Sequence, residues 1–168
     1  MFKKSSFIAL LSIVALFTVS TAAAKPGSGK KWESKKTFEI AQSFLFAAGS
    51  GDMTTLSELM ADDFVWHNEG DSSIPWIGNW EGKEVVLNEF LPKFGAGLTV
   101  TSWSTDYSFA KGNQAMFVGT MSAIANESGL DTGKFSWSVR VHVEDGKVKS
   151  WNWFEDSYAV SKAYHGAE

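Results

Sequence analysis

A carboxylate near the end of the chain stands among aromatic residues. Asp156 is preceded directly by Glu155 and lies close in sequence to Trp151, Trp153 and Phe154. Indole rings remove water from a carboxylate, and a neighbouring negative charge disfavours its ionised form, so both raise its pKa. A base of that kind takes a proton from a carbon activated by a ketone or an ester. Asp156 equally suits the N-cap of a closing helical turn, and this structural alternative stays open.

A second group of polar residues surrounds His67 and Asn68. An amide and an imidazole polarise a carbonyl group or hold a water molecule, so we expect both to act with Asp156 as catalytic residues. His67, Glu69 and Asp71 could be read as metal ligands, but three alternating residues are not the spacing of a zinc or calcium site. We therefore expect no metal and no cofactor.

The segment 69–80 is an apolar loop that contains Trp76 and Trp80. Rings of this size must be buried, either as plugs of the core or as the wall of a pocket. Together with Trp66 and Trp151, they are our candidate ligand-binding residues. The ligand expected from such a wall is small, flat and hydrophobic, for example an aromatic, terpenoid or polyketide-like molecule.

The composition excludes several classes of protein. The chain has 168 residues, of which 44% are hydrophobic and 20% are charged, so it is an ordinary globular chain that suits one domain. It has no cysteine, which excludes disulfides, iron–sulfur ligation and thiol catalysis. The formal charge of −4 argues against a nucleic-acid binder.

The first residues have the layout of a secretory signal peptide. Lys3 and Lys4 precede an apolar run over residues 7–19, and small residues follow as far as Ala24. The run is shorter than the ~20 residues that span a bilayer, so cleavage after Ala24 is favoured over an uncleaved membrane anchor. We expect a secreted or periplasmic bacterial protein without a membrane anchor. Residues 25–36 then form a flexible basic arm, and residues 37–165 form the domain.

The elements that position the candidate residues follow from hydrophobic periodicity. Apolar residues at helical spacing predict a helix over residues 38–48, a short helix capped by Asp52, and a third helix from Gly82 that Pro92 loosens near its end. Alternation and turn residues predict strands over 99–109, 115–125, 135–144 and 148–154. Helices followed by an antiparallel meander indicate an α+β fold with the helices on one face of the sheet.

Residues 135–144 form a strand with two distinct faces. The residues expected to face the core are Phe135, Trp137, Val139, Val141 and Val143. Arg140 and His142 alternate with them, so we expect both on the outer face, where a polar surface suits the interface of a homodimer with Arg140 near its two-fold axis.

Two parts of the sequence resemble a known superfamily. Residues 61–68, Gly78 and residues 80–83 resemble the front half of nuclear transport factor 2-like proteins, and residues 144–156 resemble the last hairpin of SnoaL-like polyketide cyclases and limonene epoxide hydrolases. The likeness spans residues 37–164. It implies a cone, in which a strongly curved, mostly antiparallel sheet wraps around about three helices with an apolar pocket at its open end. It also implies dimerisation through the outer face of the sheet.

The resemblance carries over to some site residues and not to others. Limonene epoxide hydrolases have Tyr-x-Asn where this chain has residues 66–68, which keep Asn68, and a carboxylate where this chain has Asp156. Their Arg-x-Asp pair falls on Thr120 and Ser122, which argues against epoxide hydrolysis. Ketosteroid isomerases have their proton-shuttling aspartate where this chain has Asn68. SnoaL-like cyclases use one aspartate as base, a role that Asp156 matches.

The sequence thus supports two functional hypotheses. The first is an exported SnoaL-like enzyme with isomerase, cyclase or hydrolase chemistry, in which Asp156 is the general base and acts on a small hydrophobic substrate. The second is a non-catalytic ligand-binding or dimerisation module of the same fold. Sequence alone names neither the substrate nor the role of the basic arm.

Overall fold

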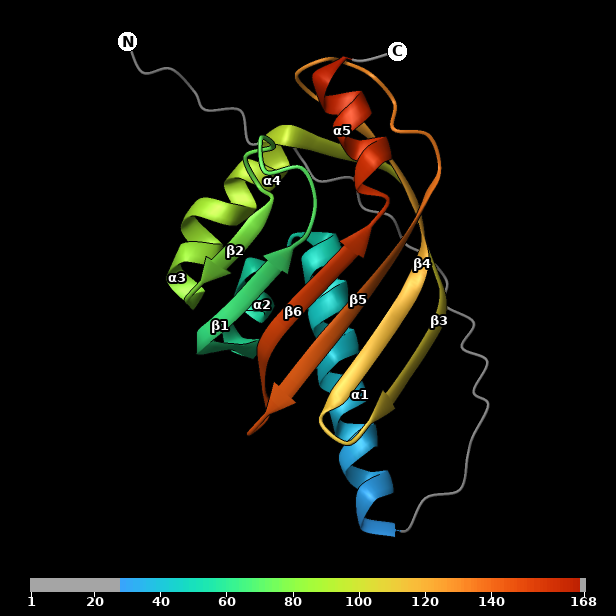
Figure 1. Ribbon diagram of the computed structural model, residues 1–168. Coiled ribbons are helices and arrows are strands. Elements are labelled where there is room, and N and C mark those ends of the chain that lie inside the picture. Colours follow the sequence, from blue (N-terminus) through green and yellow to red (C-terminus); the bar gives the residue numbers. More distant parts are fainter. Residues whose placement is uncertain (1–27, 167–168) are drawn as a thin grey trace.

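The computed structural model describes residues 28–166, and it describes side chains from Glu33 onward (Figure 1). The expected signal peptide and its cleavage point lie outside the described residues. Residues 28–36, which we expected in a flexible arm, are helical and begin helix α1 (Ser28–Ser50). Lysine and glutamate are good helix formers, and Lys35 forms an i,i+4 ion pair with Glu39 at 3.6 Å. None of the helices within residues 28–166 is long and apolar enough to cross a membrane.

Helix α1 packs one face against the sheet, which curves around it (Figure 1). Ala41, Phe44 and Ala47 are almost completely buried, and their spacing of three residues places them on one side of the helix. Phe38 stacks on Phe117 of the sheet with ring centroids 5.7 Å apart. The helix ends before Gly51, whose positive φ of 71° favours glycine.

Helix α2 (Met53–Leu59) begins where the sequence predicted. The side chain of Asp52 accepts a hydrogen bond from the backbone N–H of Thr55 at 3.0 Å, as an N-cap does. Leu56 is fully buried and fastens the short helix to the core. Met60 follows directly as the first residue of a strand.

The third predicted helix is continuous but changes its winding. Its segments are α3 (Lys83–Val85), the π-turn η1 (Val86–Phe90) and α4 (Leu91–Gly97). The backbone N–H of Leu91 bonds to Val86 five residues earlier, which is the widened turn just before Pro92. At the other end, a Cβ atom on Gly97 would overlap the ring of Trp76, so this position accepts only glycine.

The sheet has six strands and is not closed into a barrel. The strands are β1 (Met60–Asn68), β2 (Gly78–Glu81), β3 (Leu98–Lys111), β4 (Gln114–Ala125), β5 (Phe135–Glu144) and β6 (Lys147–Glu155). Their order is β2-β1-β6-β5-β4-β3. All neighbours are antiparallel except β1 and β6, which run parallel. The predicted α+β cone is therefore confirmed, with a mixed sheet in which one pair is parallel.

The side chains of β5 are buried on one face of the sheet and more exposed on the other, as their alternation in the sequence predicted. We call the face packed against α1 the inner face and the opposite one the outer face. Val139 and Val141 are fully buried on the inner face, whereas Arg140 is exposed on the outer face beside the half-buried His142. Arg140 donates a hydrogen bond to Asn152 of β6 at 3.3 Å.

Helix α5 (Ser157–His165) follows β6 and lies across one end of the sheet (Figure 1). Val160 and Ala163 are its buried residues. The carbonyl of Ala163 accepts a hydrogen bond from Ser128 in the loop between β4 and β5, at 2.6 Å. The helix therefore closes the end of the inner face at which β1 and β6 finish.

Candidate functional site

Two of the predicted tryptophans lie in the core of the inner face. Trp66 and Trp151 occupy neighbouring positions on the parallel pair β1–β6, with ring centroids 5.2 Å apart. Phe90 lies 4.6 Å from Trp66, and Phe44 lies 5.2 Å from Trp151. With Phe64 they form what we call the inner aromatic cluster. Trp66 is 7% exposed and Trp151 is 1% exposed, so both rings pack chiefly against protein.

Asn68 shares the inner face with these rings and has both ends of its amide engaged. Its Oδ1 accepts a hydrogen bond from the Trp66 indole at 2.9 Å, and its Nδ2 donates to the carbonyl of Trp76 at 3.4 Å. The side chain is buried, at 4% exposure. Asn68 therefore joins the end of β1 to the aromatic loop that follows it.

The aromatic loop over residues 69–77 packs against the end of the inner face. Trp76 is 1% exposed, and its ring meets Tyr164 of α5 edge-on at 5.4 Å. The Trp80 indole donates a hydrogen bond to the carbonyl of Trp76 at 3.2 Å, and the Lys93 ammonium lies 4.5 Å from the centre of the Trp80 ring. Trp76 is thus buried against protein, whereas Trp80 is half-buried beneath Lys93.

His67 does not join Asn68. Consecutive residues of a strand point to opposite faces, so the burial of Asn68 sends His67 to the outer face of β1. There it contacts the side chains of Asn79 and Glu69, the latter at 3.3 Å. The structure therefore separates the pair that we had expected to act together.

Asp156 makes the hydrogen bond of a helix cap. It is exposed, and its side chain accepts a hydrogen bond from the backbone N–H of Ala159 at 3.2 Å, at the start of α5. This is the structural alternative that the sequence left open. The strand β6 ends one residue earlier, and the residue at that end is the one that faces the core.

That residue is Glu155, the neighbour of Asp156 in the sequence, which we had not predicted as a site residue. Its Oε2 accepts a hydrogen bond from the Trp153 indole at 2.7 Å. Part of the residue is exposed, but the carboxyl group is surrounded by protein. Burial raises the pKa of Glu155 to about 7, and the charge of Asp156 adds to the rise, while the hydrogen bond from Trp153 opposes it.

Glu155 belongs to a compact group of three indole rings. Trp103 of β3 and Trp137 of β5 stack with centroids 4.1 Å apart, and Trp153 stacks on Trp137 at 5.1 Å with an interplanar angle of 11°. We call these three residues the tryptophan stack. Glu155 pairs directly with Trp137 across β5 and β6, so its side chain shares their face. The alternation of Trp151, Trp153 and Glu155 in the sequence would have indicated this placement.

The positions assigned by resemblance to Thr120 and Ser122 also face away from the site. The residues of β4 that alternate with them, Gly119, Met121 and Ala123, are buried, so the two hydroxyl residues lie on the outer face. Thr120 contacts Ser104 of β3 there at 2.9 Å. They therefore contribute nothing to the chemistry of the inner face.

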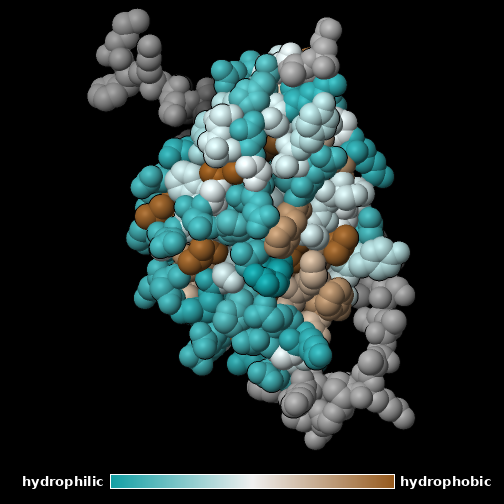
Figure 2. Space-filling view, viewed as in Figure 1, coloured by the Kyte–Doolittle hydropathy of each residue, from teal (hydrophilic) through white to brown (hydrophobic). Residues whose placement is uncertain are grey.

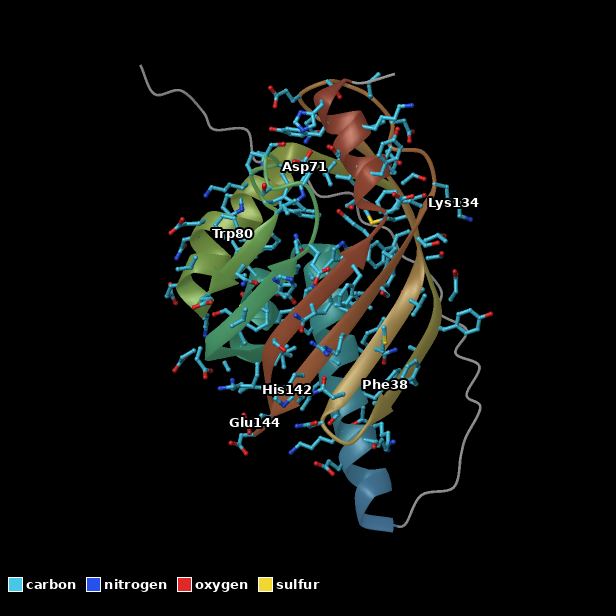
Figure 3. All side chains as sticks on the ribbon, in the orientation of Figure 1. Phe38, Asp71, Trp80, Lys134, His142 and Glu144 are labelled. Carbon is cyan, nitrogen blue, oxygen red and sulfur yellow. The ribbon has the colours of Figure 1, made fainter. Side chains whose placement is uncertain are left out.

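Asp71 fastens the aromatic loop to α5. Its carboxylate accepts hydrogen bonds from the hydroxyls of Ser161 and Ser73, both at 2.6 Å, and contacts Nε2 of His165 at 3.0 Å. These donors hold the pKa of Asp71 well below its usual range, the bond from Ser161 most strongly. Figure 3 shows Asp71 at the end of the molecule that α5 covers, far from His142. The Asp71 side chain thus contacts α5, whereas His67 and Glu69, the other two residues considered as metal ligands, contact each other.

The serine, histidine and aspartate in this group do not form a nucleophilic triad. Ser73 Oγ contacts His165 Nε2 at 2.9 Å, and Asp71 contacts the same nitrogen. A catalytic histidine needs its two nitrogens for these two partners, so that one receives the proton while the other is oriented. The group is therefore a latch between loop and helix, and we refer to it as the Asp71 latch.

Comparison with known proteins agrees with this architecture. The SnoaL-like domain matches residues 41–151 of the chain. A nuclear transport factor 2-like protein from Burkholderia xenovorans LB400 superposes with a TM-score of 0.70 at 21% identity, over 78% of this chain and 97% of that one. No curated protein matches the sequence.

Two further solved structures carry names that refer to chemistry. A protein from Jannaschia sp. CCS1 described as a SnoaL-like polyketide cyclase has a TM-score of 0.67 at 15% identity, over 86% of this chain and 100% of that one. A Mycobacterium tuberculosis LEH-like epoxide hydrolase has a TM-score of 0.61 at 20% identity, over 80% of this chain and 93% of that one. At these identities the likeness establishes the fold. Because the matched region covers most of the chain and its architecture is the same, this protein belongs to the SnoaL-like domain family.

Proposed function

We propose that the protein binds a small, flat, hydrophobic ligand beside the tryptophan stack and moves a proton on it with Glu155. The observation that carries this proposal is the Glu155 carboxyl, which is enclosed by protein and hydrogen-bonded to Trp153 at 2.7 Å. A pKa of about 7 gives this group substantial populations of both protonation states at neutral pH. That property suits a group which first accepts a proton and then returns it.

The proposed step uses only this carboxyl. Ionised Glu155 takes a proton from a carbon next to a carbonyl group, which leaves an enolate on the ligand and a neutral carboxylic acid on the protein. The acid then returns the proton to the same or to another carbon. The Trp153 N–H holds the carboxyl in place throughout and keeps one of its oxygens, Oε2, occupied. We assign the proton transfer to the other oxygen, Oε1, for which no hydrogen bond is seen among the described residues.

A non-catalytic binding or dimerisation module remains the second candidate. One observation favours it: the neighbouring carboxylate, Asp156, caps α5, so no second acid is paired with Glu155 on the inner face of the described sheet. The outer face favours dimerisation, because Tyr107 and Phe109 of β3 are 74% and 58% exposed there. Figure 2 looks onto this face and shows apolar side chains gathered over the β3 to β5 side within a polar surface.

A proton-exchange measurement tests the catalytic proposal. The probe is 2-tetralone, a flat bicyclic ketone with acidic protons beside its carbonyl, and NMR in D2O follows their replacement by deuterium. We expect the protein to accelerate the exchange, Glu155→Gln to abolish the acceleration, and Asp156→Asn to retain it. The two variants make the same chemical change at adjacent residues. Acceleration that survives in Glu155→Gln, or no acceleration by the unmodified protein, would remove Glu155 as the base.

A further inference from the structure

One indole of the tryptophan stack has no hydrogen-bond partner. The N–H of Trp153 donates to Glu155, and that of Trp103 donates to the hydroxyl of Thr105 at 3.3 Å. Trp137 is only 1% exposed, and its buried N–H has no partner among the described residues. Buried donors are nearly always paired in folded proteins, so this one needs an explanation.

The position of Trp137 relates the unpaired donor to the candidate site. Trp137 lies directly opposite Glu155 in the β5–β6 pair, and its ring contacts those of both Trp103 and Trp153, which also contact each other. On the neighbouring strand, Gly119 leaves room for the ring: a Cβ atom there would lie 2.9 Å from it. Because Gly119 has no side chain, its own position offers no polar side-chain group to the indole.

A partner for this N–H must be a hydrogen-bond acceptor. An indole N–H donates only, so a cationic group of a ligand would meet it unfavourably, whereas a carbonyl or ether oxygen would pair with it. Leaving a buried donor unpaired lowers stability, and a ligand that supplies the missing acceptor recovers that loss on binding.

On the basis of the proposed function, we propose that the ligand carries an uncharged hydrogen-bond acceptor, such as a carbonyl oxygen, which binds the N–H of Trp137 beside Glu155. The ligand is thus hydrophobic over most of its surface and has an acceptor at the end that faces the tryptophan stack.

Two naphthalene probes of similar shape test the inference. One is 2-ethylnaphthalene, which has no polar group, and the other is 2-acetonaphthone, in which a carbonyl group replaces the CH2 of the ethyl chain. Binding to the full chain is followed by quenching of tryptophan fluorescence. We expect 2-acetonaphthone to bind about three- to tenfold more tightly than 2-ethylnaphthalene, as one net hydrogen bond provides.

Two matched variants locate the donor. Trp137→Phe keeps an aromatic ring and removes the N–H, so we expect the preference for 2-acetonaphthone to disappear. Trp151→Phe makes the same change at a second buried indole that has no partner among the described residues. Its ring packs against Phe44 and Trp66 in the inner aromatic cluster and is no part of the tryptophan stack, so we expect this variant to keep the preference. Circular dichroism checks that both variants fold.

The possible outcomes separate the inference from the proposed function. If 2-ethylnaphthalene and 2-acetonaphthone bind the unmodified protein equally, the inference is wrong while a hydrophobic site remains. If neither probe binds, the proposed function fails and the inference fails with it. The comparison on unmodified protein decides the matter even if a variant does not fold.

Discussion

Trp153 and Glu155 stand two residues apart on β6, on the same face of the sheet, and the indole of the first donates a 2.7 Å hydrogen bond to the carboxyl of the second. Alternation along a strand accounts for this geometry, since residues i and i+2 share a face. The bond holds a desolvated carboxyl against the tryptophan stack. Asp156, one residue further, has left the strand and caps a helix.

The first prediction concerns the pH dependence of stability. The folded-state pKa of Glu155 is raised from 4.5 to about 7, so its contribution to stability is fully present below pH 4.5 and is lost as the pH rises toward 7. The shift corresponds to at most about 3 kcal/mol, less what solvent contact removes. Urea unfolding at pH 5 and pH 8 should show a larger loss for the unmodified protein than for Glu155→Gln. Equal losses would contradict the shifted pKa.

The second prediction concerns the Asp71 latch. Asp71→Asn replaces a carboxylate acceptor of Ser161 and His165 by an amide, so α5 should exchange its backbone hydrogens faster. Asp131→Asn is the control, because Asp131 accepts a bond only within its own loop among the contacts described, from the N–H of Gly133 at 2.7 Å. Hydrogen exchange read by mass spectrometry over α5 should separate the two variants. Identical protection would show that the latch does not hold the helix.

The contribution of the Asp71 latch to stability also depends on pH. The pKa of Asp71 is lowered in the folded state, so its contribution is present above the ordinary carboxyl pKa and is lost as the pH falls below it. Acid should therefore loosen α5 in the unmodified protein and have less effect in Asp71→Asn.

The third prediction separates a cap from a base at Asp156. Asparagine caps a helix about as well as aspartate, whereas alanine costs ~1 kcal/mol. Asp156→Ala should therefore lower the melting temperature, and Asp156→Asn should leave it nearly unchanged, as differential scanning calorimetry would record. A loss of ligand response in Asp156→Asn without loss of stability would instead favour a catalytic role for this residue.

The fourth prediction concerns assembly. The exposed Tyr107 and Phe109 and the polar centre around Arg140 suit a homodimer formed through the outer face, with Arg140 near the two-fold axis. Arg140→Glu would remove its hydrogen bond to Asn152 and place two negative charges across that axis, so it should weaken the dimer. Sedimentation velocity at tens of micromolar would decide the point, and a monomer in the unmodified protein would refute it.

The fifth prediction concerns export. If residues 1–24 are a signal peptide, the mature chain should begin within a residue or two of Lys25. Mass spectrometry of the protein from the periplasmic fraction of its native host would locate that end. A full-length chain retained in the membrane would contradict export with cleavage.

Much of the architecture could be predicted because it depends on short-range patterns. The alternation over residues 135–144 determined which side chains of β5 face the core, since side chains of a strand alternate by geometry alone. Asp52 could be recognised as a helix cap, because capping depends on a side chain and a backbone only three residues apart. The order of helices and strands then indicated an α+β fold.

The tertiary structure decided what distant segments do to one another. The parallel pairing of β1 with β6 brings Trp66 beside Trp151 and sends His67 to the other face, and nothing local to either strand encodes that pairing. Asp71 meets Ser161 across 90 residues, because α5 folds back over the aromatic loop. The sequence by itself placed two adjacent carboxylates among tryptophans. Which of them is desolvated depended on where β6 ends: the strand includes Glu155 and stops before Asp156, since the last pairing with β5 is made there.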